Sequence, residues 1–166
     1  MIAPTAVRLT PAEVAFASTL AAQRLATKAG PVGFQAAKVS PYGMHLAGVL
    51  SELAAARVYG ARVDQTVRPH GDGHAADLTA RDGRQLEIKA TTYSGADPML
   101  KLNAEHLRPG VHYVLVQIAW PDVCTVYPPI SSECVRQIGE QKDFGYGARW
   151  VVSAGKILAR ASKEVA

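Results

Sequence analysis

Cysteine is scarce in this chain of 166 residues, which contains only Cys124 and Cys134. The two form no Cys-x-x-Cys pair and have no histidines at ligand spacing, so the sequence argues against a zinc site or an iron–sulfur cluster. Two scattered cysteines are typical of buried thiols in a reducing compartment. We therefore expect a cytoplasmic protein.

Long apolar runs are missing as well. No run approaches the roughly 20 residues needed to cross a membrane, and residues 1–8 lack the basic-then-apolar order of a secretory signal. The sequence also lacks a P-loop, the glycine fingerprint of dinucleotide-binding proteins and a nucleophile elbow. We expect no membrane partner, and the commonest small α/β enzyme classes have no motif to support them.

Composition and charge are those of a globular domain with a basic bias. The chain is 48% hydrophobic and 19% charged, and its length suits one domain with a sizeable core. Its formal charge is +4 and its pI is about 9.2. This modest excess of positive charge favours an anionic partner, with nucleic acid the first candidate.

Capping signals predict two helices in the first third of the chain. Thr10-Pro11-Ala12-Glu13 reads as a capping box, with an alanine-rich helix following to about Lys28. Residues 31–43 read as a linker. A second helix is expected over residues 44–59, stopped by Gly60, and Gly48 within it suggests a close contact.

The rest of the chain predicts strands with short helices. Strands are expected at 62–68, in a hairpin at 75–90, at 112–120, at 123–127 and at 150–152. Short helices are expected at 104–107, with Asn103 as a possible cap, and from Ser131 or Ser132 to about Ile138. The last residues are expected to form a loose basic tail. This order of helix, strands, helix and strands predicts an α/β domain.

The 75–90 hairpin is the most informative stretch, and its register follows from the turn. A three-residue loop over residues 81–83 would pair Leu78 with Leu86 and Asp77 with Glu87. A two-residue Asp-Gly loop would instead pair Leu78 with Glu87 and send Asp77 to the other side. We prefer the three-residue loop because it keeps every apolar side chain on one face.

With that register, Asp77, Glu87 and Lys89 emerge together, while Leu86 and Ile88 point into the core. Two carboxylates and an amine on one strand pair cost stability through desolvation unless something binds them. A divalent cation between the carboxylates would relieve the cost. An exposed, charge-balanced hairpin face is the ordinary alternative.

The spacing Asp77-x9-Glu87-x-Lys89 resembles the D-x(n)-E-x-K pattern of the PD-(D/E)XK nuclease superfamily, which includes many restriction enzymes and resolvases. The resemblance extends over residues 46–119. It places Glu52 on a preceding helix, and a helix and the apolar strand at 113–118 follow the motif. Ala76 departs from the pattern, because a proline is frequent at that position.

The resemblance implies a restriction-endonuclease-like core, with a central mixed β-sheet flanked by helices. It implies a single nuclease domain over residues 1–166. Within it, residues 1–43 would be an N-terminal helical extension, 44–120 the catalytic core, and 121–166 C-terminal strands and a helix. The setting would be intracellular, in a prokaryote or phage.

The implied activity is Mg²⁺-dependent hydrolysis of DNA phosphodiester bonds by an endonuclease, of restriction type or of junction or repair type. Asp77 and Glu87 would hold Mg²⁺, or Mn²⁺ as a substitute, together with the backbone carbonyl of Ile88. Lys89 would orient the attacking water and stabilise developing charge. Glu52 would bind a second ion or a metal-bound water. One active site cuts one strand, so cleavage of both strands would call for a homodimer.

Further residues could contact DNA. His70 and His74 flank Asp72 in a loop and could contact phosphate, although loop histidines without such a duty are common. Donors to phosphate oxygens directly follow Ala90: Thr91, Thr92, Tyr93 and Ser94. Asp64 is a spare carboxylate. Residues 142–149 predict either a substrate-contacting loop or an ordinary surface hairpin.

Two competing interpretations remain open. A non-catalytic DNA-binding or assembly subunit could use the same fold, although every catalytic position holds a competent residue. An unrelated small α/β enzyme is the other alternative.

Overall fold

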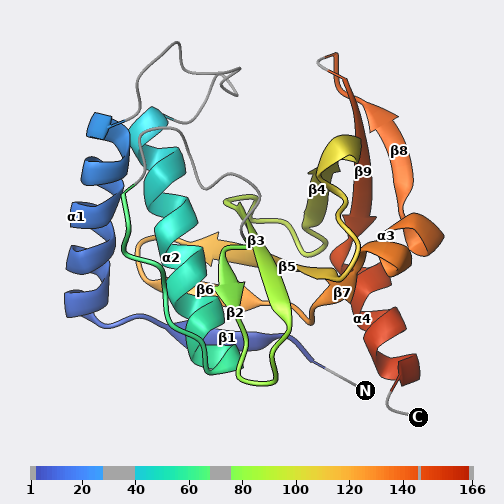
Figure 1. The fold of residues 1–166 in the computed structure, drawn as a ribbon, viewed down its shortest axis with the longest axis horizontal. Helices are drawn as coiled ribbons and strands as arrows, with labels where there is room; N and C mark the ends of the chain where they lie inside the picture. Colours follow the sequence, from blue (N-terminus) through green and yellow to red (C-terminus); the bar gives the residue numbers. More distant parts are fainter. Residues whose placement is uncertain (1–2, 28–39, 68–75, 146, 165–166) are drawn as a thin grey trace.

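The computed structural model describes residues 3–27, 40–67, 76–145 and 147–164 (Figure 1). Its helices are α1 (Pro11–Thr27), α2 (Pro41–Tyr59), α3 (Ser132–Ile138) and α4 (Ala154–Glu164), with a 3₁₀ turn η1 (Ala104–His106). Its strands are β1 (Thr5–Arg8), β2 (Leu78–Thr79), β3 (Gln85–Thr91), β4 (Met99–Asn103), β5 (Val111–Ala119), β6 (Val123–Val126), β7 (Ile130–Ser131), β8 (Glu140–Asp143) and β9 (Ala148–Ser153).

The strands form two sheets. In the larger, the order is β1-β6-β5-β3-β2, and β7 pairs with β5. β3 and β5 run parallel, whereas the other pairs are antiparallel. The smaller sheet has the antiparallel order β4-β9-β8. The fold is therefore mixed α/β, with a mixed sheet and flanking helices, as the sequence predicts.

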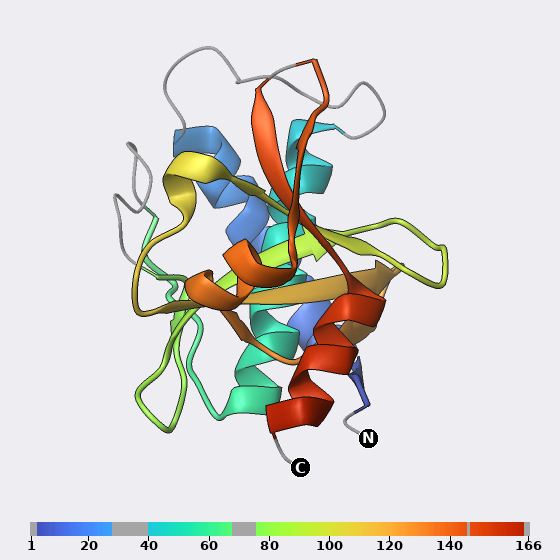
Figure 2. The same cartoon turned by 90° about the vertical axis from the view of Figure 1, so that its right-hand side faces the viewer.

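The larger sheet is the middle layer of the molecule. α1 and α2 cover one face, and the smaller sheet with α3 and α4 lies on the other (Figures 1 and 2). β5 is buried on both faces. Val114 and Val116 belong to the core beneath α1 and α2, whereas Tyr113 and Leu115 belong to the core on the other side. The strand expected at 112–120 is confirmed.

Both N-terminal helices form where capping chemistry predicts, but α2 begins earlier than expected. The backbone N–H of Thr10 donates to Glu13 Oε2 at 2.7 Å, which confirms the capping box. Ser40 caps α2 by accepting a hydrogen bond from the Gly43 N–H, with Pro41 in the first turn. Gly60 ends α2 with a φ of 63°. Most of the expected 31–43 linker lies outside the described residues.

The strand expected at 62–68 is wrong, since residues 62–67 have extended or irregular backbone without a strand partner in the described part of the chain. Side chains form hydrogen bonds with the backbone of this segment instead. Arg24 Nη2 donates to the Asp64 carbonyl at 3.0 Å, and the Thr66 N–H donates to Asp64 Oδ1 at 2.9 Å. The second contact is an Asx turn, which competes with ladder formation.

The loose basic tail is also wrong. Residues 154–164 form α4, with Ala154, Ile157 and Ala161 all buried against the smaller sheet and α3 side of the molecule. These residues recur at the spacing of one helix face, so the helix is held by tertiary packing. β1, β4, β7 and β8 were not expected, because each is short and β8 is entirely exposed.

The close contact expected at Gly48 is absent: a Cβ added there would have no described atom within 4 Å. We therefore predict that Gly48→Ala raises the free energy of unfolding by about 0.5–1 kcal/mol, because alanine loses less backbone entropy in a helix. Urea unfolding would measure it. Gly139→Ala is the contrasting variant, since its Cβ would lie 2.5 Å from the Val135 carbonyl oxygen. Loss of stability in Gly48→Ala would contradict the prediction.

Candidate active site

The hairpin has the register that the three-residue loop predicts. Leu78 pairs with Leu86, and the Ala80 N–H donates to the Arg84 carbonyl at 2.9 Å. Gly83 adopts a φ of 87°, a left-handed conformation that glycine takes without a Cβ clash. Leu86 and Ile88 are buried beneath the helices. The alternative two-residue loop is therefore wrong.

Asp77 meets Glu87 and Lys89 at an open part of the edge of β3. β2 is only two residues long, so Asp77 lies just before its start. The Ile88 N–H donates to Asp77 Oδ2 at 2.6 Å. The Asp77 carboxylate thus accepts a backbone N–H that a neighbouring strand would otherwise bind. This N–H belongs to Ile88, between Glu87 and Lys89. Asp77 lies close enough to Glu87 and Lys89 for their charges to act on its carboxyl, and their joint binding of a metal stays a prediction.

Glu87 has a cation at each carboxylate oxygen. Lys89 Nζ lies 2.8 Å from Oε1, and Arg108 Nη2 lies 2.9 Å from Oε2. The Glu87 side chain is 17% exposed, so both ion pairs are shielded from bulk water. Arg108 was not identified from the sequence. Only the topology could have indicated it. Parallel pairing of β5 with β3 brings the segment before β5, which contains Arg108, near the start of β3.

Glu52 faces α1 from α2 and is also paired. Arg24 binds it through two contacts, Nη1 to Oε1 at 2.8 Å and Nη2 to Oε2 at 3.1 Å. The two side chains are 20% and 12% exposed. A bidentate arginine fixes the orientation of the carboxylate as well as balancing its charge. Arg24 therefore reaches from α1 across to α2.

The electrostatics show that these groups act on one another. Burial raises the pKa of Asp77 to about 7, and the neighbouring charges of Glu87 and Glu52 add to the rise. The Ile88 N–H and the Lys89 ammonium oppose it. Asp77, Glu52, Glu87 and Lys89 thus share one electrostatic environment, although they come from three separate segments.

Hydrogen bonds hold the backbone that follows β3. The Tyr93 N–H donates to Thr91 Oγ1 at 3.2 Å, and Gln117 Nε2 donates to the Tyr93 carbonyl at 2.8 Å. Thr92 and Ser94 are exposed, and the Tyr93 side chain is among the most exposed aromatics described, at 58%. His70, His74 and Asp72 lie outside the described residues.

The basic and aromatic stretch 142–149 contributes Lys142 and Asp143 to β8 and Ala148 and Arg149 to β9, and these four residues pair in an antiparallel hairpin, one of the two predicted structures. Lys101 Nζ on β4 lies 4.6 Å from the centre of the Phe144 ring. Asp64 is engaged in its Asx turn. Its carbonyl also accepts from Arg24, the partner of Glu52, at 3.0 Å.

The oxygen donors at this edge of the sheet are the carboxylates of Asp77 and Glu87. Among the described residues, no three histidine, cysteine, aspartate or glutamate side chains group closely enough to hold an ion. Mg²⁺ commonly uses one or two carboxylates and keeps waters for the rest. Asp77 and Glu87 meet that requirement. Ile88 can add only its backbone, because its side chain is in the core.

No protein-family model matches the chain, and no curated protein matches it in sequence. Among the helices described, none has the length and apolarity to span a membrane.

Proposed function

We propose that this chain is a Mg²⁺-dependent nuclease that hydrolyses DNA phosphodiester bonds as an endonuclease. One observation carries the proposal. Asp77 Oδ2 accepts a hydrogen bond at 2.6 Å from the backbone N–H of Ile88, the residue between Glu87 and Lys89. Two carboxylates and an amine meet there at a strand edge, with Glu52 close enough to influence Asp77. This is the set of groups that metal-assisted phosphodiester hydrolysis requires.

The fold supports a restriction-endonuclease-like core in part. Helix α2 precedes the β2–β3 hairpin, and β5 lies parallel to β3 in a mixed sheet. Two features depart from the expected order. The described residues 62–67 form no strand, and β4 with the short turn η1 stands where an α-helix was expected before β5. The proposal therefore depends on the site more than on the order of elements.

Each side chain would have a separate task. Asp77 and Glu87, with the carbonyl of Ile88, would hold Mg²⁺, which neutralises phosphate charge and lowers the pKa of bound water. Lys89 would orient the attacking water and stabilise charge on the phosphate. Glu52, fixed by Arg24, would position a further water or a second ion.

DNA is the proposed partner, with Mn²⁺ as a substitute for Mg²⁺. The exposed donors after β3 and the net charge of +4 favour a phosphate backbone. Double-strand or junction cleavage would require two copies of the site, which a homodimer provides by symmetry. The proposed role is intracellular.

The direct test is incubation of the purified protein with supercoiled plasmid, linear, single-stranded and branched DNA in Mg²⁺, Mn²⁺ or EDTA. Nicking of the plasmid in Mg²⁺ and Mn²⁺, and none in EDTA, is the expected result. Release of nucleotides from linear ends without nicking would assign an exonuclease instead. DNA binding without any cleavage would favour the non-catalytic subunit.

A further inference from the structure

Among the described residues, Arg108 is the one cation of the candidate site supplied from outside the helices and the hairpin. It lies between η1 and β5, and its Nη2 contacts Glu87 Oε2 at 2.9 Å. Its side chain is 24% exposed, compared with 32% for Lys89. Both cations therefore flank the same carboxylate while keeping part of their surface open to a ligand.

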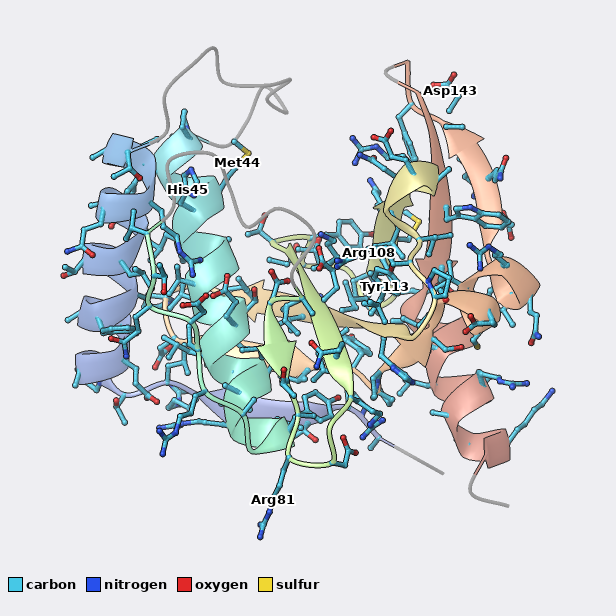
Figure 3. The ribbon with its side chains drawn as sticks, viewed as in Figure 1. Met44, His45, Arg81, Arg108, Tyr113 and Asp143 are labelled. Atoms are coloured by element: carbon cyan, nitrogen blue, oxygen red, sulfur yellow. The ribbon has the colours of Figure 1, made fainter. Side chains whose placement is uncertain are left out.

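Two side-chain contacts hold the backbone beside Arg108. Its N–H donates to the hydroxyl of Tyr113 at 2.8 Å, and Tyr113 is fully buried on β5. Arg136 Nη2 donates to the neighbouring Leu107 carbonyl at 3.3 Å. Figure 3 shows Arg108 and Tyr113 together between β3 and the smaller sheet. Their placement directs the arginine towards the hairpin edge.

When Asp77 is ionised, the charges of the described site residues balance in the protein alone. The carboxylates are Glu52, Asp77 and Glu87, and the paired or adjacent cations are Arg24, Lys89 and Arg108. With a divalent cation added, the cluster would have an excess of two positive charges. Such an excess suits a phosphodiester, whose transition state gathers further negative charge.

Arg108 and a metal would compete for Glu87. Both Glu87 oxygens already accept from cations, so a metal that binds Oε2 would weaken the hold of Arg108, as one that binds Oε1 would weaken that of Lys89. A guanidinium cannot lose its charge, and its forked donors match phosphate oxygens. The group released from Glu87 would thus lie beside the bound phosphate.

We propose that Arg108 holds Glu87 in the metal-free protein and contacts the scissile phosphate once Glu87 is shared with a divalent cation. This inference rests on the proposed nuclease function. It adds a catalytic arginine that the sequence pattern does not contain, and it couples metal loading to phosphate binding through one side chain.

The first measurement needs no cleavage. Mn²⁺ binding to the DNA-free protein, followed by electron paramagnetic resonance, is expected to tighten roughly tenfold in Arg108→Met, because a competing charge is removed. Arg57→Met is the matched control, since Arg57 is also a partly exposed arginine in an ion pair, with Glu13 at 2.8 Å, and takes no part in the candidate site. It should leave the Mn²⁺ affinity unchanged.

The second measurement is the kcat of plasmid nicking at saturating Mg²⁺. Arg108→Met is expected to lower kcat at least 100-fold, in the range found when a phosphate-contacting arginine is lost. Arg108→Lys, which retains the charge without the fork, should fall between it and the wild type. Tighter metal binding with slower turnover is a signature that a purely structural ion pair would not produce.

The outcomes separate the two proposals. An unchanged kcat in Arg108→Met, or Mn²⁺ binding that weakens or stays the same in both Arg108 variants, would overturn the role of Arg108 while wild-type nicking upholds the nuclease. A wild type that nicks no DNA would overturn the nuclease and the phosphate contact together. The Mn²⁺ affinities would then still decide whether Arg108 competes for Glu87.

Discussion

Asp77→Asn is expected to abolish Mg²⁺-dependent DNA cleavage while the protein stays folded. Asparagine can still accept the Ile88 N–H, so the hydrogen bond that seats the side chain can persist. It has no charge with which to hold a divalent cation. Loss of groups that merely support metal ligands costs about 10–100-fold, so we expect a loss of more than about 100-fold here. Plasmid nicking in Mg²⁺ and Mn²⁺ measures it.

Asp82→Asn is the matched control for that substitution. Asp82 lies on the same hairpin, but its side chain is 53% exposed and caps the turn by accepting from the Arg84 N–H at 3.1 Å. Asparagine supports the same Asx geometry. The variant should therefore nick plasmid at the wild-type rate. Wild-type activity in Asp77→Asn would remove Asp77 from the mechanism.

The wild-type protein should lose stability between pH 4 and pH 8 through Asp77, and Asp77→Asn should not. Burial raises the pKa of this carboxyl from 3.8 in a free aspartate to about 7 in the folded chain. A raised carboxyl pKa stabilises the folded state fully below pH 3.8, and that contribution disappears as the pH rises through 7. A shift of this size corresponds to at most about 4 kcal/mol.

Urea unfolding at pH 5 and pH 8 in EDTA measures this effect. From pH 5 to pH 8, the free energy of unfolding of Asp77→Asn should rise relative to that of the wild type, since the asparagine has no proton to lose. Adding Mg²⁺ at pH 8 should then recover stability in the wild type only. A pH-independent difference between the two proteins would show that Asp77 titrates normally.

The local geometry of the candidate site could be predicted from the sequence. The register follows from turn chemistry and alternation within residues 75–90, where Gly83 and the apolar Leu78, Leu86 and Ile88 admit one arrangement. Its ion-pair partners could not. Arg24 lies 28 residues from Glu52, and Arg108 lies 21 residues from Glu87. Such contacts depend on how separate elements pack, which local patterns do not encode.

Errors in the fold have identifiable physical causes. Residues 62–67 look like a strand, but side chains of Arg24 and Asp64 satisfy part of their backbone. The terminal helix was predictable in principle, because Ala154, Ile157 and Ala161 recur on one face. Its many charged residues suggested a solvated tail instead. The short strand β1 gains its partner only from a distant segment, β6, whereas the fully exposed β8 pairs with β9 in a local hairpin.

The double burial of β5 has a consequence for protein engineering. β3, which carries Glu87 and Lys89, is bonded along its whole length to β5, and Tyr113 on β5 supports Arg108. β5 in turn needs apolar cover on both sides, including Tyr127, Val135 and Ile157 from beyond residue 120. A fragment of residues 44–120 would leave one side of that strand exposed to solvent. Grafting the site onto another scaffold would therefore require the complete three-layer support.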